Sequence, residues 1–263
     1  MLALSQAECP VFHHFGPGIY IREVHLPAGA TAIGHAQKFA HTNVMIKGRV
    51  LMFNEDGTTK ELVAPLLFVG KPGRKVGHVL EDTVWQNIYA TDETDVETLE
   101  RTYLDKSETW RADHAARAVT QNDRHAADRA DYLAVLSESG FDHDMVRAQS
   151  ENTSDQIAMP AGSYAVMVAD SPVEGRGLFA TAAIKAGGLI APGRIGGKRT
   201  PAGRYTNHSA KPNAAVFLRD NGDMDLVALT DIAGCRGGQI GEEITIDYRQ
   251  VLRLQGARLK GEV

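Results

Sequence analysis

Three short segments in the C-terminal half constrain the fold and chemistry of this chain more than any other feature. They read Glu-Gly-Arg-Gly-Leu-Phe at 174–179, Arg-Tyr-Thr-Asn-His-Ser-Ala-Lys-Pro-Asn at 204–213 and Glu-Glu-Ile-Thr-Ile-Asp-Tyr at 242–248. Glycines on both sides of one residue let backbone groups approach a ligand closely, although an isolated Gly-x-Gly is more often a plain hairpin turn. The Asn-His pair offers both donors and acceptors. The last segment predicts an amphipathic strand that ends in a tyrosine, with Ile244 and Ile246 on one face.

Taken in this order, the segments resemble the signature of the SET domain. This is the fold of one class of protein-lysine methyltransferases that use S-adenosylmethionine (SAM). The apolar stretch 226–232, which precedes Gly241-Glu242, adds a fourth matching element. The resemblance covers residues 163–249 and implies small curved β-sheets with a last strand threaded beneath a loop, which is rare among folds.

The resemblance also implies roles for individual residues. Tyr248 would be the catalytic tyrosine, and Tyr205 would lie near the lysine channel. The backbone of the Gly-x-Gly turn would hold the methionine part of SAM, and the Asn-His pair would contact its amino-acid and adenine portions. The implied cofactor-binding residues are Gly175, Arg176, Gly177, Leu178, Asn207 and His208.

Physical chemistry then states what such a site has to do. Only a neutral amine can take up a methyl group, so a lysine of ordinary pKa ~10.4 has to lose its proton, and a desolvated channel lowers that pKa. The Tyr248 hydroxyl would orient the amine, because a phenol of ordinary pKa ~10 is poorly suited to accept the proton. An aromatic wall such as Tyr205 suits a developing methylammonium.

Two departures from the family pattern concern the parts that recognise the substrate. The stretch Ile190–Arg204 is short for the insert that shapes the substrate groove, and no cysteine cluster follows Tyr248. Only Arg249–Val263 remains to close the channel, with Leu252 and Leu254 as apolar candidates. The alternative is therefore a non-catalytic structural or assembly module. The compact form is similar to bacterial or viral SET proteins.

The N-terminal part carries a different pattern, in which short predicted strands alternate with Gly and Pro. The turn Asp56-Gly57 predicts a hairpin between two of these strands. A defined spacing, Gly-x₅-His-x-Gln-x₃-His-x₆-Gly, is formed by Gly29, His35, Gln37, His41 and Gly48. It resembles the first cupin motif, with Gln in place of the second His and His in place of Glu. Pro72-Gly73 and His78 resemble the second motif with altered spacing.

The cupin resemblance implies a β-barrel that could hold a divalent metal. Imidazole suits Zn, Fe or Ni, and the implied ligands are His35, Gln37, His41 and His78. Because Gln is a weak ligand, a metal-free barrel whose histidines satisfy hydrogen bonds stays open. A metal-dependent cupin enzyme that acts on a small molecule is a third hypothesis for the function.

We therefore expect a mainly β protein with a helical connector, of class α+β. The predicted regions are a cupin-like barrel at 1–93, the connector at 94–160, a SET domain at 161–250 and a tail at 251–263. In the connector, a helix within Asp113–Ser139 is expected to end at Gly140, with a second helix in Phe141–Ser150. Its charges are expected to form a solvated face.

Composition narrows the setting. The net charge is -5, which argues against strong nucleic-acid binding. No apolar run is long enough for a membrane span, and the first residues do not resemble a secretory signal. Only Cys9 and Cys235 are present, so no disulfide framework is expected. These features predict a cytoplasmic protein, or host cytoplasm or virus particle for a viral one. The SET resemblance implies a protein substrate, and the cupin resemblance implies a possible homo-oligomer.

Overall fold

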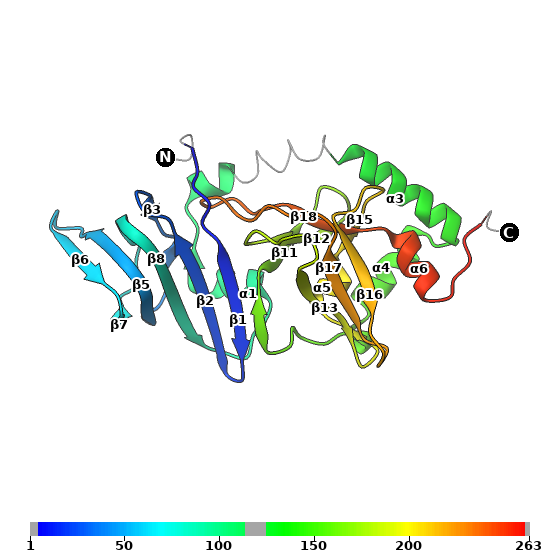
Figure 1. The fold of residues 1–263 in the computed structure, drawn as a ribbon, viewed down its shortest axis with the longest axis horizontal. Helices are drawn as coiled ribbons and strands as arrows, with labels where there is room; N and C mark the ends of the chain where they lie inside the picture. Colours follow the sequence, from blue (N-terminus) through cyan, green and yellow to red (C-terminus); the bar gives the residue numbers. More distant parts are fainter. Residues whose placement is uncertain (1–4, 114–124, 261–263) are drawn as a thin grey trace.

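The computed structural model describes residues 5–113 and 125–260 and is mainly β, which confirms the predicted class. Figure 1 shows the N-terminal strands at one end of the molecule and the C-terminal helix at the other, with the C-terminal strands between them. Within the described residues, no helix combines the length and the apolar composition that a membrane crossing requires.

The N-terminal region is one antiparallel sheet of eight strands. The order is β10-β1-β2-β8-β5-β6, with β3 also on β8 and β7 also on β5. The strands are β1 (Val11–Gly16), β2 (Ile19–Leu26), β3 (Thr31–Ile33), β5 (His41–Phe53), β6 (Thr59–Val63), β7 (Leu66–Gly70), β8 (Val76–Ala90) and β10 (Gly162–Tyr164). Because β10 pairs with β1, residues 162–164 of the predicted SET region join the N-terminal sheet.

Local sequence explains the turns of this sheet. Gly57 has φ 79° in the turn between β5 and β6, which confirms the predicted hairpin. Strands β6 and β7 are separated at Ala64-Pro65, because proline has no N–H for a ladder. Side chains of these strands pack together in a buried apolar cluster, which consists of Met45, Val50, Leu62 and Trp85.

The connector is helical, as predicted, but its first helix is followed by a short strand that pairs with the N-terminal region. Strand β9 (Leu104–Asp105) pairs with β4 (Ala36–Gln37), and residues 108–113 are helical. The helices are α1 (Val96–Tyr103), α3 (Ala126–Ser139), α4 (His143–Glu151) and the 3₁₀ turn η1 (Thr153–Asp155). Helix α3 ends at Gly140 with φ 77°, the predicted C-cap, while the part of the expected helix at 114–124 lies outside the described residues.

The C-terminal region consists of two small four-stranded sheets. One has the order β11-β12-β18-β15 and the other β14-β13-β17-β16. Their strands are β11 (Val166–Asp170), β12 (Arg176–Ala180), β13 (Leu189–Ile195), β14 (Lys198–Arg199), β15 (Asn207–His208), β16 (Ala214–Leu218), β17 (Met224–Ala228) and β18 (Glu243–Ile246). Helix α5 (Pro201–Tyr205) precedes β15, and α6 (Tyr248–Leu254) follows β18.

Strand β18 brings the three sequence segments together. It runs antiparallel to β12, which follows the Gly-x-Gly turn, and parallel to β15, which holds the Asn-His pair. The expectation of one exposed face is wrong, because neighbours cover both faces of β18 and leave Glu243 and Thr245 only 7% and 6% exposed. The strand also ends at Ile246, and Tyr248 opens helix α6 with Asp247 as its N-cap.

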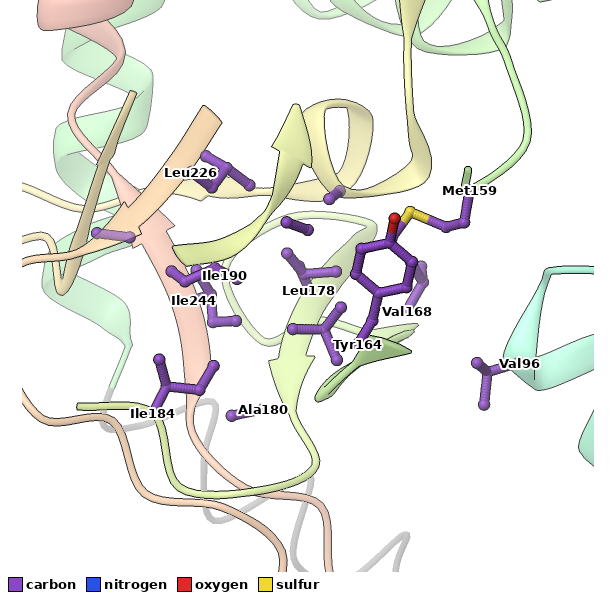
Figure 2. Close-up of a cluster of buried hydrophobic side chains, with 14 of the residues drawn as sticks. Val96, Met159, Tyr164, Val168, Leu178, Ala180, Ile184, Ile190, Leu226 and Ile244 are labelled. Atoms are coloured by element: carbon purple, nitrogen blue, oxygen red, sulfur yellow. The ribbon is translucent and has the colours of Figure 1, made fainter. Parts of the chain in front are cut away.

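A shared apolar core joins the regions (Figure 2). Leu178, Ile190, Leu226 and Ile244 fill the centre of the C-terminal region, and the cluster continues through Tyr164 toward the connector. Burying one such aliphatic side chain contributes about 1.5–3 kcal/mol. The two β regions are therefore expected to unfold together.

Candidate functional site

Asn207 connects three segments that are far apart in the sequence. Its side-chain amide donates to the carbonyl oxygens of Glu174 (3.0 Å) and Arg176 (3.1 Å) and to Oε1 of Glu243 (2.9 Å). The amide nitrogen has two protons but faces three acceptors, so acceptors outnumber donors at this point. A group that brings additional N–H donors would match it chemically.

Glu243 adds negative charge to the same cluster. Its Oε1 also accepts from the Ser171 hydroxyl at 2.7 Å, whereas its buried Oε2 has no hydrogen-bond partner among the described residues. Burial raises the pKa of Glu243, and the hydrogen bonds from Ser171 and Asn207 act in the opposite direction. A buried carboxylate with one free oxygen favours a cation beside it.

The two glycines of the turn are required for different reasons. Gly175 has φ 51°, a left-handed conformation that glycine adopts without strain. At Gly177, a Cβ atom would lie 2.2 Å from Oε1 of Glu243 and 3.0 Å from Cβ of Ser171. The bare backbone at Gly177 is therefore what lets β12 approach the Glu243 carboxylate.

Arg176 and Tyr205 form a stack beside the turn. The Arg176 guanidinium lies 5.2 Å from the Tyr205 ring centroid, and that of Arg204 lies 5.0 Å from the same ring. Arg176 also forms an ion pair with Glu97 of α1, so the connector reaches the turn. Leu178, which we predicted as a cofactor contact, is 1% exposed and packs in the core.

The His208 side chain is fully buried and uses both ring nitrogens. The backbone N–H of Tyr248 donates to Nδ1 at 3.1 Å, so the ring proton lies on Nε2 and is donated to Asp131 at 2.8 Å. His208 therefore fixes the start of α6 and connects it to α3.

Helix α3 is fastened to this region by an ion-pair network. The Arg249 guanidinium donates to Asp131 at 2.8 and 3.1 Å and to Glu138 at 2.7 and 2.8 Å. These hydrogen bonds lower the pKa of Asp131 to about 2. Ser209 also donates to Asp128 at 2.5 Å. The expectation that the connector charges form a solvated face is therefore wrong for α3.

Tyr248 lies between α3 and the Asn-His segment. Its hydroxyl donates to the carbonyl oxygen of Thr206 at 3.0 Å, and its ring meets Tyr132 edge-on at 6.2 Å between centroids. Burial raises the pKa of Tyr248, so the phenol keeps its proton at neutral pH.

A cavity of about 350 Å³ adjoins this tyrosine. Tyr248 and Thr206 belong to its wall, together with apolar side chains from α3, α4, β17 and α6, among them Leu226 and Leu252. Of the two residues predicted to close a channel, Leu252 lines this cavity, whereas Leu254 is 41% exposed. Neither the Gly-x-Gly turn nor Tyr205 is among the described residues that line this cavity.

The N-terminal histidines are arranged differently. His41 is 6% exposed; its Nδ1 donates to the carbonyl oxygen of Phe39 at 3.1 Å, and its Nε2 accepts from the Asn87 amide at 3.2 Å. Protein groups therefore occupy both nitrogens that a metal would need.

The other predicted ligands have separate neighbours. His35 packs edge-on against Trp110, and burial lowers its pKa to about 4. Gln37 accepts from the Tyr89 hydroxyl at 2.9 Å, and His78 lies 3.4 Å from a threonine hydroxyl of β3. In the described part of the chain, no group of three or more His, Cys, Asp or Glu side chains could hold a metal ion. The geometry gives the predicted Zn, Fe or Ni site no support.

Comparison with known families identifies the C-terminal region. Residues 194–249 match the model of the SET domain, so this part of the chain carries a SET domain, as the motifs predicted. The Asn-His segment and Glu242–Tyr248 lie inside the match, and the Gly-x-Gly turn precedes it. No curated protein was found that matches the chain.

Solved structures similar to part of the chain include cupins. A cupin domain from Bordetella pertussis Tohama I is 12% identical, with TM-score 0.28, over 34% of this chain and 99% of that one. An RmlC-like cupin family protein from Methanocaldococcus jannaschii is 15% identical, with TM-score 0.27, over 33% and 84%. The ectoine synthase from P. lautus is 10% identical, with TM-score 0.29, over 40% and 86%. These likenesses concern the fold alone and say nothing of what this chain binds.

Sequence reasoning missed the residues that connect the motifs. Glu243 lies inside a recognised segment, but nothing in the local pattern shows that its carboxylate turns inward. Asp128, Asp131 and Glu138 recur near helical spacing on α3, which was the available signal for one common partner surface. Arg249 directly follows Tyr248 and binds two of these carboxylates.

Proposed function

We propose that this chain transfers a methyl group from SAM to the ε-amine of a protein lysine. The observation that carries the proposal is the acceptor cluster around Asn207, whose side chains Asn207 and Glu243 lie inside the SET domain match. The α-ammonium of SAM has three N–H donors and a positive charge. A cluster with surplus acceptors and a buried carboxylate suits such a group.

The residues present fit this cofactor in two further respects. Oε2 of Glu243 is buried without a partner, and the missing Cβ at Gly177 leaves the backbone bare beside that carboxylate. The backbone of Gly175–Gly177, the Asn207 amide and the His208 backbone are the groups that would hold it. When bound, SAM supplies an electrophilic methyl group on its sulfonium.

The chain's own task is to present a neutral amine. The cavity is lined by apolar side chains and by arginines, and both disfavour an ammonium ion and so lower the pKa of a lysine that enters it. The protonated Tyr248 phenol donates to Thr206, which leaves its oxygen lone pair free to accept from the amine N–H. Tyr248 would thereby orient the amine rather than take its proton. Positioning of this kind can lower the activation barrier by, at best, on the order of 7–11 kcal/mol.

The second candidate is a non-catalytic assembly module. It is favoured by the packing of α3 across the Asn-His segment and Tyr248, through Asp131 and Tyr132. In that case the Asn207 cluster serves only to hold three chain segments together, and the protein would bind a partner chain or form a homo-oligomer.

Calorimetric titration of the full chain with SAM separates the two candidates. The proposed function predicts saturable binding with a dissociation constant in the micromolar range. It also predicts transfer of labelled methyl groups from SAM to lysine in a mixed protein extract. A stable oligomer that binds no SAM would contradict the proposal and support the assembly module.

A further inference from the structure

We infer that the cavity beside Tyr248 binds an acidic side chain of the protein substrate, close to the lysine presented for methylation. This inference rests on the proposed function and names a feature of its substrate. It follows from the charges around the cavity, from their existing partners and from the nature of the walls. The charged side chains that line the cavity are Asp155, Arg194, Arg199, Arg204 and Asp225.

Both carboxylates of this set are already paired. Asp155 accepts from the Arg199 guanidinium at 2.9 and 3.1 Å. Asp225 accepts from Arg219, which is not among the lining residues, with both contacts at 2.6 Å. Each of these aspartates therefore has its own arginine.

Two guanidinium groups remain without a carboxylate. Neither Arg194 nor Arg204 forms an ion pair with any described residue, and the Nε atom of Arg204 is buried without a hydrogen-bond partner. The hydrogen bonds from Arg199 lower the pKa of Asp155 most, and the charges of Arg194 and Arg204 lower it further, so both guanidinium groups lie near this carboxylate. A buried donor without a partner is unfavourable, and an anion that supplied the missing acceptor would remove this cost.

The residues that line the cavity indicate which kind of molecule would provide that anion. The cavity combines these arginines with apolar side chains and reaches the Tyr248 phenol. Before it loses its proton, a lysine is an ammonium ion, and a lysine entering alone would bring this cation toward two guanidinium groups without carboxylate partners, which is unfavourable. An aspartate or glutamate on the same peptide would neutralise them through charge-assisted, bidentate hydrogen bonds. An acidic residue near the target lysine is therefore the occupant that fits both parts of the cavity.

Fluorescence anisotropy with two matched peptide pools tests the inference without any methyl transfer. Both pools carry fluorescein and a central lysine; the flanking positions contain glutamate in one pool and glutamine in the other. We expect the full-length protein to bind the glutamate pool at least about tenfold more tightly at low salt. In Arg194→Gln and Arg204→Gln, the preference should fall toward unity. Arg194→Gln alone decides the test if Arg204→Gln does not fold.

Arg147→Gln is the matched control, because Arg147 lies on α4, is paired with Glu151 and does not line the cavity. It should keep the full preference for glutamate. Equal affinity for both pools in the unmodified protein would overturn the inference while leaving SAM binding intact. Arginine variants that lose SAM affinity but keep the glutamate preference would also overturn it, because the cavity would then hold the cofactor. A glutamate preference in a protein that binds no SAM would support the cavity assignment and refute only the proposed methyl transfer.

Discussion

Each of the two β regions has a buried asparagine at the centre of a hydrogen-bond network, and the two networks differ. In the N-terminal sheet, Oδ1 of Asn43 accepts from Trp85 Nε1 and from the Asn87 amide, both at 2.9 Å, and the Asn43 amide donates to the His41 carbonyl at 3.1 Å. The network closes on itself within β5 and β8. It is a structural arrangement that needs no ligand.

In the C-terminal region, the buried asparagine belongs to a network in which hydrogen-bond acceptors lack donors. Asn207 faces more acceptors than it has protons, and one oxygen of Glu243 has no partner. The difference shows that a buried polar group by itself does not indicate function. A mismatch between donors and acceptors at the meeting point of distant segments is the better indicator.

The largest expected difference between the regions concerns two phenols. Tyr248→Phe should lower methyl transfer by a factor of about 100 or more, because the amine loses the group that orients it. Tyr89→Phe removes a comparable hydroxyl from the N-terminal region, where it donates to Gln37. This control should keep its activity within about twofold and lose about 1 kcal/mol of stability. Steady-state kinetics measures the rates of the two variants, and urea denaturation measures their stabilities. Similar rate losses in the two variants would contradict a specific role of the Tyr248 hydroxyl in methyl transfer.

The next effect separates the two glycines of the turn. Gly177→Ala should cost about 2–3 kcal/mol and abolish SAM binding, because its Cβ meets a carboxylate that Ser171 and Asn207 hold in place. Gly175→Ala meets no atom within 4 Å and should cost only about 1–2 kcal/mol, for the left-handed backbone. Urea denaturation measures both; the reverse order would show that the Glu243 carboxylate moves freely.

A third test concerns the closed network. Asn43→Ala should destabilise the protein by about 1–3 kcal/mol, because Trp85 Nε1 and the Asn87 amide lose their acceptor in a buried position. The affinity for SAM should not change in the folded variant. Thermal denaturation and calorimetry give the two quantities. A variant with full stability would mean that water reaches the Asn43 network.

The smallest effect is a pH dependence. Because Arg249 and His208 lower the pKa of Asp131 to about 2, below the ordinary value of about 3.9, ionised Asp131 stabilises the fold. That contribution is complete above pH ~4 and is lost as the pH falls toward 2. The stability difference between the unmodified protein and Asp131→Asn should therefore be about 1–2 kcal/mol at pH 6 and shrink below pH 4. A difference that stays constant down to pH 2.5 would contradict the network.

The C-terminal motifs were predictable because they retain residues whose chemistry is specific. Asn207 and Glu243 come together because β18 pairs with both β12 and β15. The α3 network was not predictable, since nothing local to Asp131 identifies Arg249 as its partner more than a hundred positions away. The Glu243 oxygen without a hydrogen-bond partner could not be predicted either, because its burial depends on residues that pack against both faces of β18.

The N-terminal spacing was misleading for a physical reason. A strand places alternate residues on one side, which made His35 and Gln37 candidate co-ligands. Instead, β4 begins at Ala36 and pairs with β9 of the connector, and Gln37 turns to the Tyr89 hydroxyl. The positions at which this sequence departs from the cupin motif are thus used for contacts within the protein.

The most direct test of the central claim compares two ligands that differ in one amino group. Calorimetry on the full chain would use S-adenosylhomocysteine and its analogue without the α-amino group. If the acceptor surplus around Asn207 and Glu243 holds the cofactor's ammonium, the parent compound should bind at least about tenfold more tightly, and Asn207→Ala should remove most of that difference. Equal affinity for the two compounds, or no binding of either, would contradict the account.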